Sequence, residues 1–345
     1  MVWVLALKMT LLAITLAKSL KGVKTMSQIT SENIPVIDIG QLVRGELNLQ
    51  VANKLRQASH DPGFIYVCNH GISESVTDEA RNAAKLFFLQ AESDKSNVII
   101  SENHRGWLAS GGAVMTDGVE ADLKESFVWG HDAGIDHHQA HSLQGKNQWP
   151  TQAMGFKKAA EAWLNSAERL AQILLRNIAF SLELDSNFFL RRNDNPLTRA
   201  SFVYYPPRPM AVASDPATAR YGVGPHTDFG VMTILCQDHI GGLQMQNTQG
   251  HWLDAPPIDG TLVVNIGDLL QRWTGGEFRS APHRVLSPDV TDRISLVLAF
   301  DPNPESIVDA GEIFPEQRAA AEPITCGDYL DWRFDQAFHY RATDA

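Results

Sequence analysis

Two histidines and an aspartate have the types and spacing of a metal site. His226 and Asp228 are separated by one residue, so on an extended strand both side chains point to one face, roughly 7 Å apart along the backbone. His283 follows Asp228 by 55 positions, in or beside a later strand. Two imidazole nitrogens and one carboxylate oxygen leave the opposite side of an ion open, which suits ferrous iron that must bind further ligands. With 12 histidines in the chain, roughly one His-x-Asp is expected by chance, so the motif depends on its surroundings.

Three more residues on expected strands can hold a carboxylate. Arg293 and Ser295 alternate on one strand and therefore share a face, which Val297 and Ala299 continue. A guanidinium beside a hydroxyl can bind one carboxylate through charge-assisted hydrogen bonds, and Tyr205, at the end of another strand, can add its phenol. Taken singly, Arg293 also fits a surface ion pair and Tyr205 a strand-edge aromatic. A metal triad and a carboxylate clamp in one chain are a far rarer coincidence than either alone.

A second group of histidines lies in the glycine-rich segment 101–150, at His131, His137, His138 and His141. His137 and His141 would share one face of a helix, but the His-Glu-x-x-His pattern of zinc proteases is missing. Glycine and glutamine dominate the neighbouring positions. We therefore interpret this segment as a solvated loop rather than as a metal site.

Composition excludes several classes of partner. The chain has 345 residues and a formal net charge of −11, which argues against nucleic acid and against an anionic membrane surface as the main partner. The net charge says nothing positive about the substrate. Its three cysteines, Cys68, Cys236 and Cys326, are far apart and odd in number, as expected of free thiols in a reducing, cytoplasmic compartment.

The first 25 residues differ from the rest. They are apolar, but Lys8 interrupts them, and no run reaches the ~18–20 residues that a membrane span needs. A basic start and a small-x-small cleavage site are both missing, which disfavours a signal peptide. We expect translation to begin at Met26, so that residues 1–25 form an extension outside the native protein, with no stable membrane anchor. Residues 26–150 and 151–345 are then expected to pack as one integrated globular unit.

The pattern of apolar residues predicts an α+β protein with helices first and strands later. Helical spacing appears at 51–61 and 73–90, in a long support helix from a Thr151 cap to about Leu184, and at 327–340. Short strands are expected at 34–39, 64–68, 200–205, 231–236, 243–246, 252–253, 261–266, 281–286 and 294–300. About eight late strands divided by Gly, Pro, Asp and Asn turns indicate a double-stranded β-helix, or jelly roll, wrapped by helices and open at one mouth.

The motifs of the chain resemble those of the iron(II)/2-oxoglutarate-dependent dioxygenases of the isopenicillin N synthase-like family. Five C-terminal motifs carry the resemblance: 225–230 (Pro-His-Thr-Asp-Phe-Gly), 241–244 (Gly-Gly-Leu-Gln), 264–268 (Val-Asn-Ile-Gly-Asp), 280–285 (Ser-Ala-Pro-His-Arg-Val) and 293–295 (Arg-Ile-Ser). Segments 34–38, 63–71, 124–127 and 147–150 resemble the family's N-terminal region. The similarity extends from about residue 34 to 335.

The resemblance implies that His226, Asp228 and His283 bind Fe(II). It also implies that Arg293, Ser295 and Tyr205 hold the distal carboxylate of 2-oxoglutarate. The expected reaction converts 2-oxoglutarate and O2 to succinate and carbon dioxide while a small-molecule substrate is oxidised, most simply by hydroxylation. The chain departs from the family at Val203, where an asparagine is common, which puts one polar contact near the iron in doubt.

Three alternatives stay open. An oxidase of the same fold could use Fe(II) and O2 without 2-oxoglutarate, as isopenicillin N synthase and the ethylene-forming oxidase do, since Arg293 and Ser295 could hold a substrate carboxylate instead. A metal-dependent isomerase on a β-barrel would work without oxygen. A non-catalytic binding module would fail to bind iron. For the substrate, position relative to the motifs suggests a pocket lined by a set of large side chains: Arg105, Trp107, Phe127, Trp129, Trp273 and Phe300.

Overall fold

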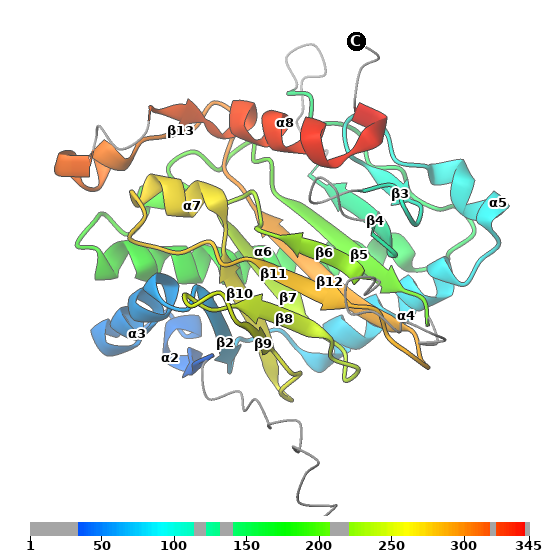
Figure 1. The fold of residues 1–345 in the computed structure, drawn as a ribbon, viewed down its shortest axis with the longest axis horizontal. Coiled ribbons are helices and arrows are strands. Elements are labelled where there is room, and N and C mark those ends of the chain that lie inside the picture. Colours follow the sequence, from blue (N-terminus) through cyan, green and yellow to red (C-terminus); the bar gives the residue numbers. More distant parts are fainter. Residues whose placement is uncertain (1–33, 114–121, 132–140, 208–220, 318–321, 342–345) are drawn as a thin grey trace, which may run out of the picture.

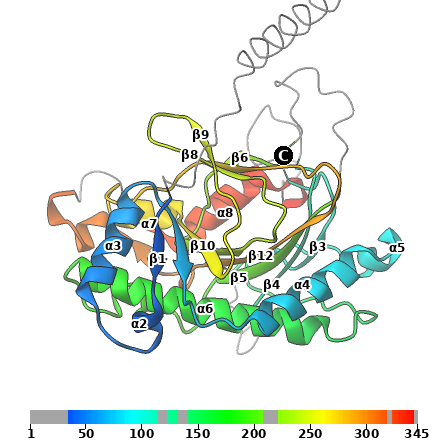
Figure 2. The ribbon, with the colours of Figure 1, turned by 90° about the horizontal axis from the view of Figure 1, so that it is seen from below.

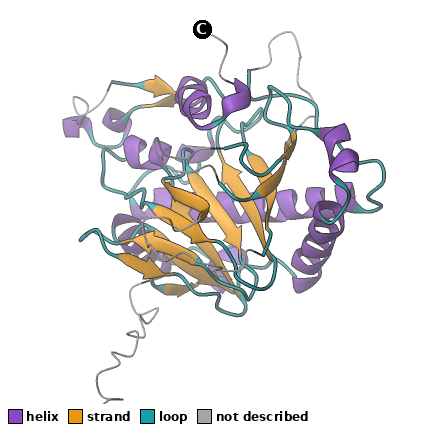
Figure 3. Ribbon diagram, turned by 45° about the vertical axis from the view of Figure 1, so that its right-hand side comes forward, coloured by secondary structure: helices purple, strands orange, loops and turns teal. Residues whose placement is uncertain are grey.

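The computed structural model describes residues 34–113, 122–131, 141–207, 221–317 and 322–341. The expected N-terminal extension, 1–25, lies outside these ranges, as do His137 and His138. Figure 3 shows strands gathered in the middle of the molecule with helices around them. This is the jelly-roll core wrapped by helices that the late strand pattern predicts.

Eight strands form the larger sheet, in the order β1-β2-β10-β7-β12-β5-β4-β3. Their bounds are β1 (Val36–Asp38), β2 (Phe64–Cys68), β3 (Gly106–Leu108), β4 (Glu125–Gly130), β5 (Arg199–Tyr205), β7 (Met232–Cys236), β10 (Thr261–Ile266) and β12 (Arg293–Phe300). Strands from the first 150 residues thus complete both edges, while all pairs except β1–β2 are antiparallel. The N-terminal region and the later strands therefore share one sheet.

Four strands form the smaller sheet, in the order β6-β11-β8-β9. They are β6 (Tyr221–His226), β8 (Leu243–Gln246), β9 (Trp252–Asp254) and β11 (His283–Leu286). A two-stranded ribbon, β13 (Ile307–Val308) with β14 (Ile324–Thr325), lies apart from both sheets. Figure 2 shows β6, β8 and β9 on one side of the large sheet and the helix α6 on the other.

The two faces of the large sheet carry different residues because side chains alternate along each strand. On β12, Ile294, Leu296, Leu298 and Phe300 face the helices and join the larger apolar core. The other face turns toward the small sheet, where a second apolar cluster includes Val203, Val223, Met245 and Val285. Arg293 and Ser295 belong to this inner face, as their alternation predicts.

The helices cover the outer face and one end. They are α2 (Gly40–Val43), α3 (Leu49–His60), α4 (Glu74–Phe88), α5 (Glu92–Lys95), α6 (Phe156–Ser181), α7 (Asp268–Trp273) and α8 (Cys326–Ala337). The long α6 is the predicted support helix, and its apolar stripe includes Trp163, Leu170 and Leu174. Figure 1 shows α8 along the upper edge of the molecule, above β6 and β5. None of the helices in the described ranges has both the length and the apolar character that a membrane crossing needs.

Several expected boundaries were wrong. The α6 helix starts after Gly155, at φ 80°, so Thr151 is not its cap. Segment 101–150 is not all loop, since it contains β3 and β4. These strands are short, and they are held by pairing (β3 with β4, and β4 with β5) rather than by a strong apolar alternation. The strand expected to carry His226 and Asp228 is β6, but it ends at His226, before Asp228. Its upstream part escaped prediction, because two glycines and a proline in Tyr221–His226 lower its strand propensity.

Candidate metal centre

The two histidines of the expected triad are cross-strand partners. β6 and β11 pair antiparallel, and in this register His226 lies opposite His283. Their ring centroids are 4.2 Å apart, and Phe64 of the large sheet meets the His283 ring edge-on at 5.3 Å. The 55-residue separation between Asp228 and His283 is therefore closed by direct strand pairing.

Hydrogen bonds to the backbone orient both imidazoles. Nδ1 of His226 lies 2.8 Å from the carbonyl oxygen of Gly224, and Nδ1 of His283 lies 3.1 Å from that of Ala281. A carbonyl oxygen only accepts, so each Nδ1 must carry the proton and donate it. Each Nε2 then keeps its lone pair, which is the atom that a metal would bind.

Asp228 lies just beyond the end of β6 and faces both Nε2 atoms. Its Oδ1 is 3.7 Å from Nε2 of His226 and 3.6 Å from Nε2 of His283. The ligand atoms of these three residues all lie within 4.8 Å of one another, and they are the one such group of metal-binding side chains within the described ranges. The side-chain amide of Asn265, on β10, donates a hydrogen bond to Oδ2 of Asp228 at 2.7 Å. Oδ1 is therefore the oxygen that faces the two histidine nitrogens.

A close backbone contact holds the loop that carries Asp228. The amide of Asp268 donates to the carbonyl oxygen of Asp228 at 2.8 Å, and the carboxylate of Asp268 accepts from the Thr227 hydroxyl at 3.0 Å. Gly267 makes this approach possible, because a Cβ there would lie 2.1 Å from the carbonyl oxygen of Gly230. The segment 264–268 thus fixes the loop as well as the carboxylate.

The charge states also suit a cation. Burial, followed by the neighbouring His283, lowers the pKa of His226 to about 3, so its ring is neutral at physiological pH. Burial alone would raise the pKa of Asp228, but both histidines and the Asn265 amide hold it below its ordinary value. Neutral imidazole and ionised carboxylate are the forms that coordinate a divalent metal. The donor set, two nitrogens and one oxygen with an open side, fits ferrous iron.

Arg293 and Ser295 carry buried polar atoms that lack partners among the described residues. Arg293 is 1% exposed, and its Nε donates to the carbonyl oxygen of Gly241 at 2.7 Å. Its two terminal nitrogens and the Oγ of Ser295, also 1% exposed, have no hydrogen-bond partner there. A buried guanidinium without a counter-charge is costly. An anion with several acceptor oxygens would satisfy all three atoms together.

Tyr205 contacts this guanidinium through its ring. The two residues are cross-strand partners on β5 and β12, and the guanidinium carbon lies 4.6 Å from the centre of the Tyr205 ring. The ring has room because position 222 is glycine, where a Cβ would come within 2.5 Å of it. The contact is a cation–π interaction; a hydrogen bond from the phenol to a carboxylate stays a prediction.

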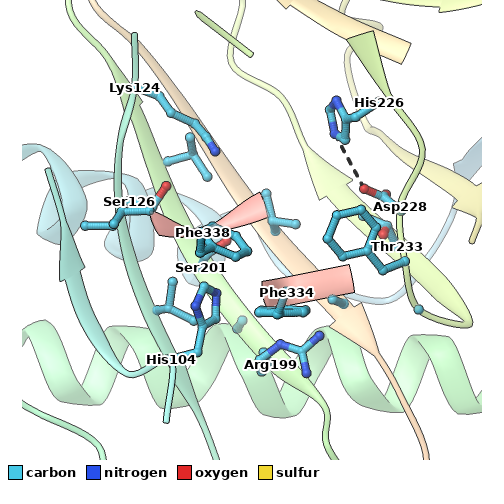
Figure 4. Close-up of a pocket in the computed structure, with 18 of the residues that line it drawn as sticks. His104, Lys124, Ser126, Arg199, Ser201, His226, Asp228, Thr233, Phe334 and Phe338 are labelled. Atoms are coloured by element: carbon cyan, nitrogen blue, oxygen red, sulfur yellow. Dashed lines mark ion pairs between the residues drawn. The ribbon is translucent and has the colours of Figure 1, made fainter. Parts of the chain in front are cut away.

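A cavity of about 190 Å³ adjoins the metal centre. Its walls come from β4, β5, β7, β12, the 226–230 loop and α8, and Figure 4 shows His226 and Asp228 on one side of it. Phe334 and Phe338, on α8 and at its C-terminal end, contribute two aromatic rings, 5.1 Å apart. This is the candidate substrate pocket.

The large side chains expected to line that pocket do not line it. All six of them, Arg105, Trp107, Phe127, Trp129, Trp273 and Phe300, are missing from its wall. Phe127, Trp129 and Phe300 belong instead to the core beneath the helices. Ser126 and Val128, the neighbours of Phe127 and Trp129, line the cavity, so for these two aromatic residues the prediction chose the right stretch of chain and the wrong face. Phe334 and Phe338 could not be predicted as pocket residues, because in the sequence they are marked only by an apolar stripe at helical spacing.

The histidines of segment 101–150 serve separate contacts where the structure describes them. Nε2 of His131 lies 3.0 Å from a carboxylate oxygen of Glu168, and Nε2 of His141 lies 3.1 Å from one of Asp331. Neither belongs to a group of metal-binding side chains in the described ranges. The three cysteines are free thiols, as predicted.

Comparisons with known proteins identify the family of this chain. The model of the 2OG-Fe(II) oxygenase superfamily matches residues 195–302, and that of the N-terminal region of the non-haem dioxygenases of morphine synthesis matches 34–152. A probable iron/ascorbate oxidoreductase of Dictyostelium discoideum is 36% identical over 338 residues, 90% of each chain. A 2-oxoglutarate-dependent dioxygenase of Monascus ruber is 32% identical, and the match covers 78% of this chain and 85% of that protein.

A solved structure is similar as well. The crystal structure of a full-length Neurospora crassa protein in complex with alpha-KG and thymine has a TM-score of 0.77 at 29% identity, and the match covers 87% of this chain and 96% of that one.

Proposed function

The chain belongs to the 2OG-Fe(II) oxygenase superfamily, and we propose that His226, Asp228 and His283 are its iron ligands. The observation that carries this proposal is the convergence of two Nε2 atoms and one carboxylate oxygen within 4.8 Å. The backbone carbonyls behind the imidazoles and the Asn265 amide behind the carboxylate hold all three in ligating orientation.

Arg293 and Ser295 would bind the distal carboxylate of 2-oxoglutarate. Their buried, unpartnered donors match the oxygens of that group, and the apolar cluster around them excludes water. Tyr205 contacts the guanidinium through its ring and would present its phenol to the same carboxylate. An arginine in a dry pocket favours a dianionic cosubstrate over a neutral one.

When bound, the iron supplies the site at which O2 converts 2-oxoglutarate to succinate and carbon dioxide, while one oxygen atom enters a substrate C–H bond as a hydroxyl group. The protein itself orients the cosubstrate, keeps the centre dry and presents the substrate from the adjoining cavity. We propose hydroxylation of a small molecule because that cavity opens beside His226 and Asp228. The free thiols favour the cytoplasm as its compartment.

The test compares the wild-type protein with Asp228→Ala and His283→Ala. Wild type should bind one Fe(II) per chain in an anaerobic titration and release succinate from 2-oxoglutarate. Each variant should lose most of its iron affinity and its succinate release, because a two-ligand centre holds the metal weakly. As a matched control, His141→Ala removes a histidine paired with Asp331 outside the triad and should keep both properties. Full turnover by Asp228→Ala would contradict the ligand assignment.

A further inference from the structure

One wall of the cavity carries hydrogen-bond donors that the metal centre does not use. Lys124, Ser126 and Ser201 line it from the residue before β4, from β4 and from β5. Figure 4 shows Lys124 and Ser126 on the side opposite His226 and Asp228. A ligand that touches this wall would therefore extend across the cavity toward the metal centre.

Lys124 is a buried cation with spare donors. The residue is 9% exposed. Its Nζ lies 3.3 Å from Oδ2 of Asp122, and this is its one ion pair within the described ranges. Oδ2 of Asp122 has no partner there that meets hydrogen-bond geometry, so the pairing is loose. An ammonium has three protons, and at least two of them remain for a ligand.

The chain positions this lysine against the strand of the metal centre. Oδ1 of Asp122 accepts from the amide of Gly224 at 2.9 Å. The carbonyl of the same Gly224 accepts from His226. Asp122 thus connects Lys124 with the backbone that orients a proposed iron ligand.

Two hydroxyls extend the polar wall. Ser126 follows Lys124 by two positions and shares its face, and Ser201 lies opposite Val128 on β5. No hydrogen bond joins either hydroxyl to another described residue, and Ser126 is 5% exposed. Together with Lys124 they place a cation and two hydroxyls on the wall of one cavity, which suits a carboxylate.

Two buried ion pairs lie along this wall, Lys124 with Asp122 and Arg199 with Asp301. His104, also on the cavity wall, has its pKa held well below the ordinary value, first by burial and then by the positive charges of Arg199, Arg105, Arg341 and Lys124. Arg199 is committed to Asp301 at 2.9 Å. Lys124 is thus the cation on this wall whose donors are still available for a ligand in the cavity.

The rest of the wall is apolar. Val128, Val203 and Val297 line it from three adjacent strands, and Phe334 and Phe338 close it from α8 and its C-terminal end. Such a surface favours a hydrocarbon or aromatic body over a sugar or a polyamine, because unpaired polar groups would lose their hydration there.

We propose that the substrate of this enzyme is a small carboxylic acid with an apolar body, whose carboxylate binds Lys124, Ser126 and Ser201. This rests on the proposed function and names the class of molecule that the same cavity takes. The carboxylate lies away from the metal ligands, so the C–H bond presented for oxidation belongs to the apolar end.

The test measures binding without turnover. The protein, loaded with Fe(II) and 2-oxoglutarate under anaerobic conditions, is titrated by calorimetry with hexanoate, phenylacetate and 4-phenylbutanoate, and with the three matched primary amides. At least one acid should bind about tenfold or more tightly than its amide, because a charge-assisted hydrogen bond replaces a neutral one.

The double variant Lys124→Met/Asp122→Asn removes both charges together, so no buried carboxylate is left unpaired. It should lower the affinity for the acid by about ten- to hundredfold and leave that for the amide within about twofold. Ser126→Ala with Ser201→Ala should weaken binding of the acid by about three- to tenfold. Lys157→Met, which removes an exposed lysine of α6, should preserve the preference.

Two outcomes would overturn the inference: no acid binds more tightly than its amide, or the preference survives in Lys124→Met/Asp122→Asn. Succinate release by the wild type under oxygen is measured separately. A protein that selects acids in this way but releases no succinate would contradict the proposed function while leaving the recognition of the acid intact.

Discussion

The side-chain amide of Asn265 donates to Oδ2 of Asp228 at 2.7 Å, while Oδ1 of the same carboxylate faces both histidines. Asn265 comes from β10 of the large sheet, whereas both histidines belong to the small sheet. One hydrogen bond therefore connects the large sheet with the loop that follows β6 at the metal centre. It selects which carboxylate oxygen a metal would meet.

This relationship predicts a positioning role for Asn265. Asn265→Ala should weaken Fe(II) binding by about 10- to 100-fold, the usual range for an outer partner of a metal ligand. An anaerobic Fe(II) titration measures the change. As a control, Asn177→Ala removes another buried asparagine, 5% exposed, whose amide donates within α6. It should lose stability and keep its iron affinity; equal effects on iron in both variants would refute the role.

Arg293 should lower the stability of the ligand-free protein, although it is needed to bind the cosubstrate. Without a ligand its guanidinium is buried and lacks a counter-charge among the described residues. Arg293→Met should therefore leave the free energy of unfolding of the ligand-free protein unchanged, or raise it by about 1–4 kcal/mol. Its affinity for 2-oxoglutarate should fall by at least about 100-fold. Denaturant unfolding with and without 2-oxoglutarate measures both effects.

Arg199 supplies the matched comparison. Its guanidinium is similarly buried but pairs with Asp301 at 2.9 Å, and their side chains are 7% and 0% exposed. Arg199→Met leaves the buried carboxylate of Asp301 without a counter-charge and should destabilise the protein by about 3–5 kcal/mol. If Arg293→Met costs as much as Arg199→Met, Arg293 is a structural ion-pair residue and its proposed role is wrong.

Acid should destabilise the protein through His104. Burial, with nearby positive charges, holds the pKa of His104 well below that of the unfolded chain, so the folded state favours the neutral ring. Stability is then full above the unfolded pKa of about 6.5 and falls as the pH drops below it, by up to about 1.4 kcal/mol at pH 5.5. His104→Asn keeps a residue that tolerates the positive φ of 58°.

Urea unfolding of both proteins at pH 8.0 and 5.5 measures this contribution. The wild type should lose more stability over this range than His104→Asn does. The same loss in both would show that His104 accepts its proton without cost. Its partner, the Tyr340 hydroxyl, would then have to accommodate a protonated ring.

The convergence of His226, Asp228 and His283 was predictable because it depends on a short sequence spacing and on strand topology. His226 and Asp228 are two positions apart, and a jelly roll pairs an early with a late strand, which brings His283 opposite His226. The alternation that places Arg293 and Ser295 on one face follows from strand geometry alone. Neither step needs knowledge of distant packing.

The cavity was not predictable for the opposite reason. Its walls depend on which face of β4 turns inward, and that phase is set by pairing with β5 and not by a regular apolar alternation in residues 125–130. Phe334 and Phe338 reach the cavity because α8 packs over one end of the sheets. Asn265 lies on an expected strand, but nothing in the local sequence connects it with Asp228.

Oxygen uptake with and without 2-oxoglutarate tests the central claim most directly. In the presence of Fe(II), the wild-type protein should consume O2 only when 2-oxoglutarate is supplied, with one succinate formed per O2, and Arg293→Met should need a much higher 2-oxoglutarate concentration for the same rate. Oxygen uptake that proceeds unchanged without 2-oxoglutarate would contradict the account and identify an oxidase in which Arg293 and Ser295 hold another carboxylate.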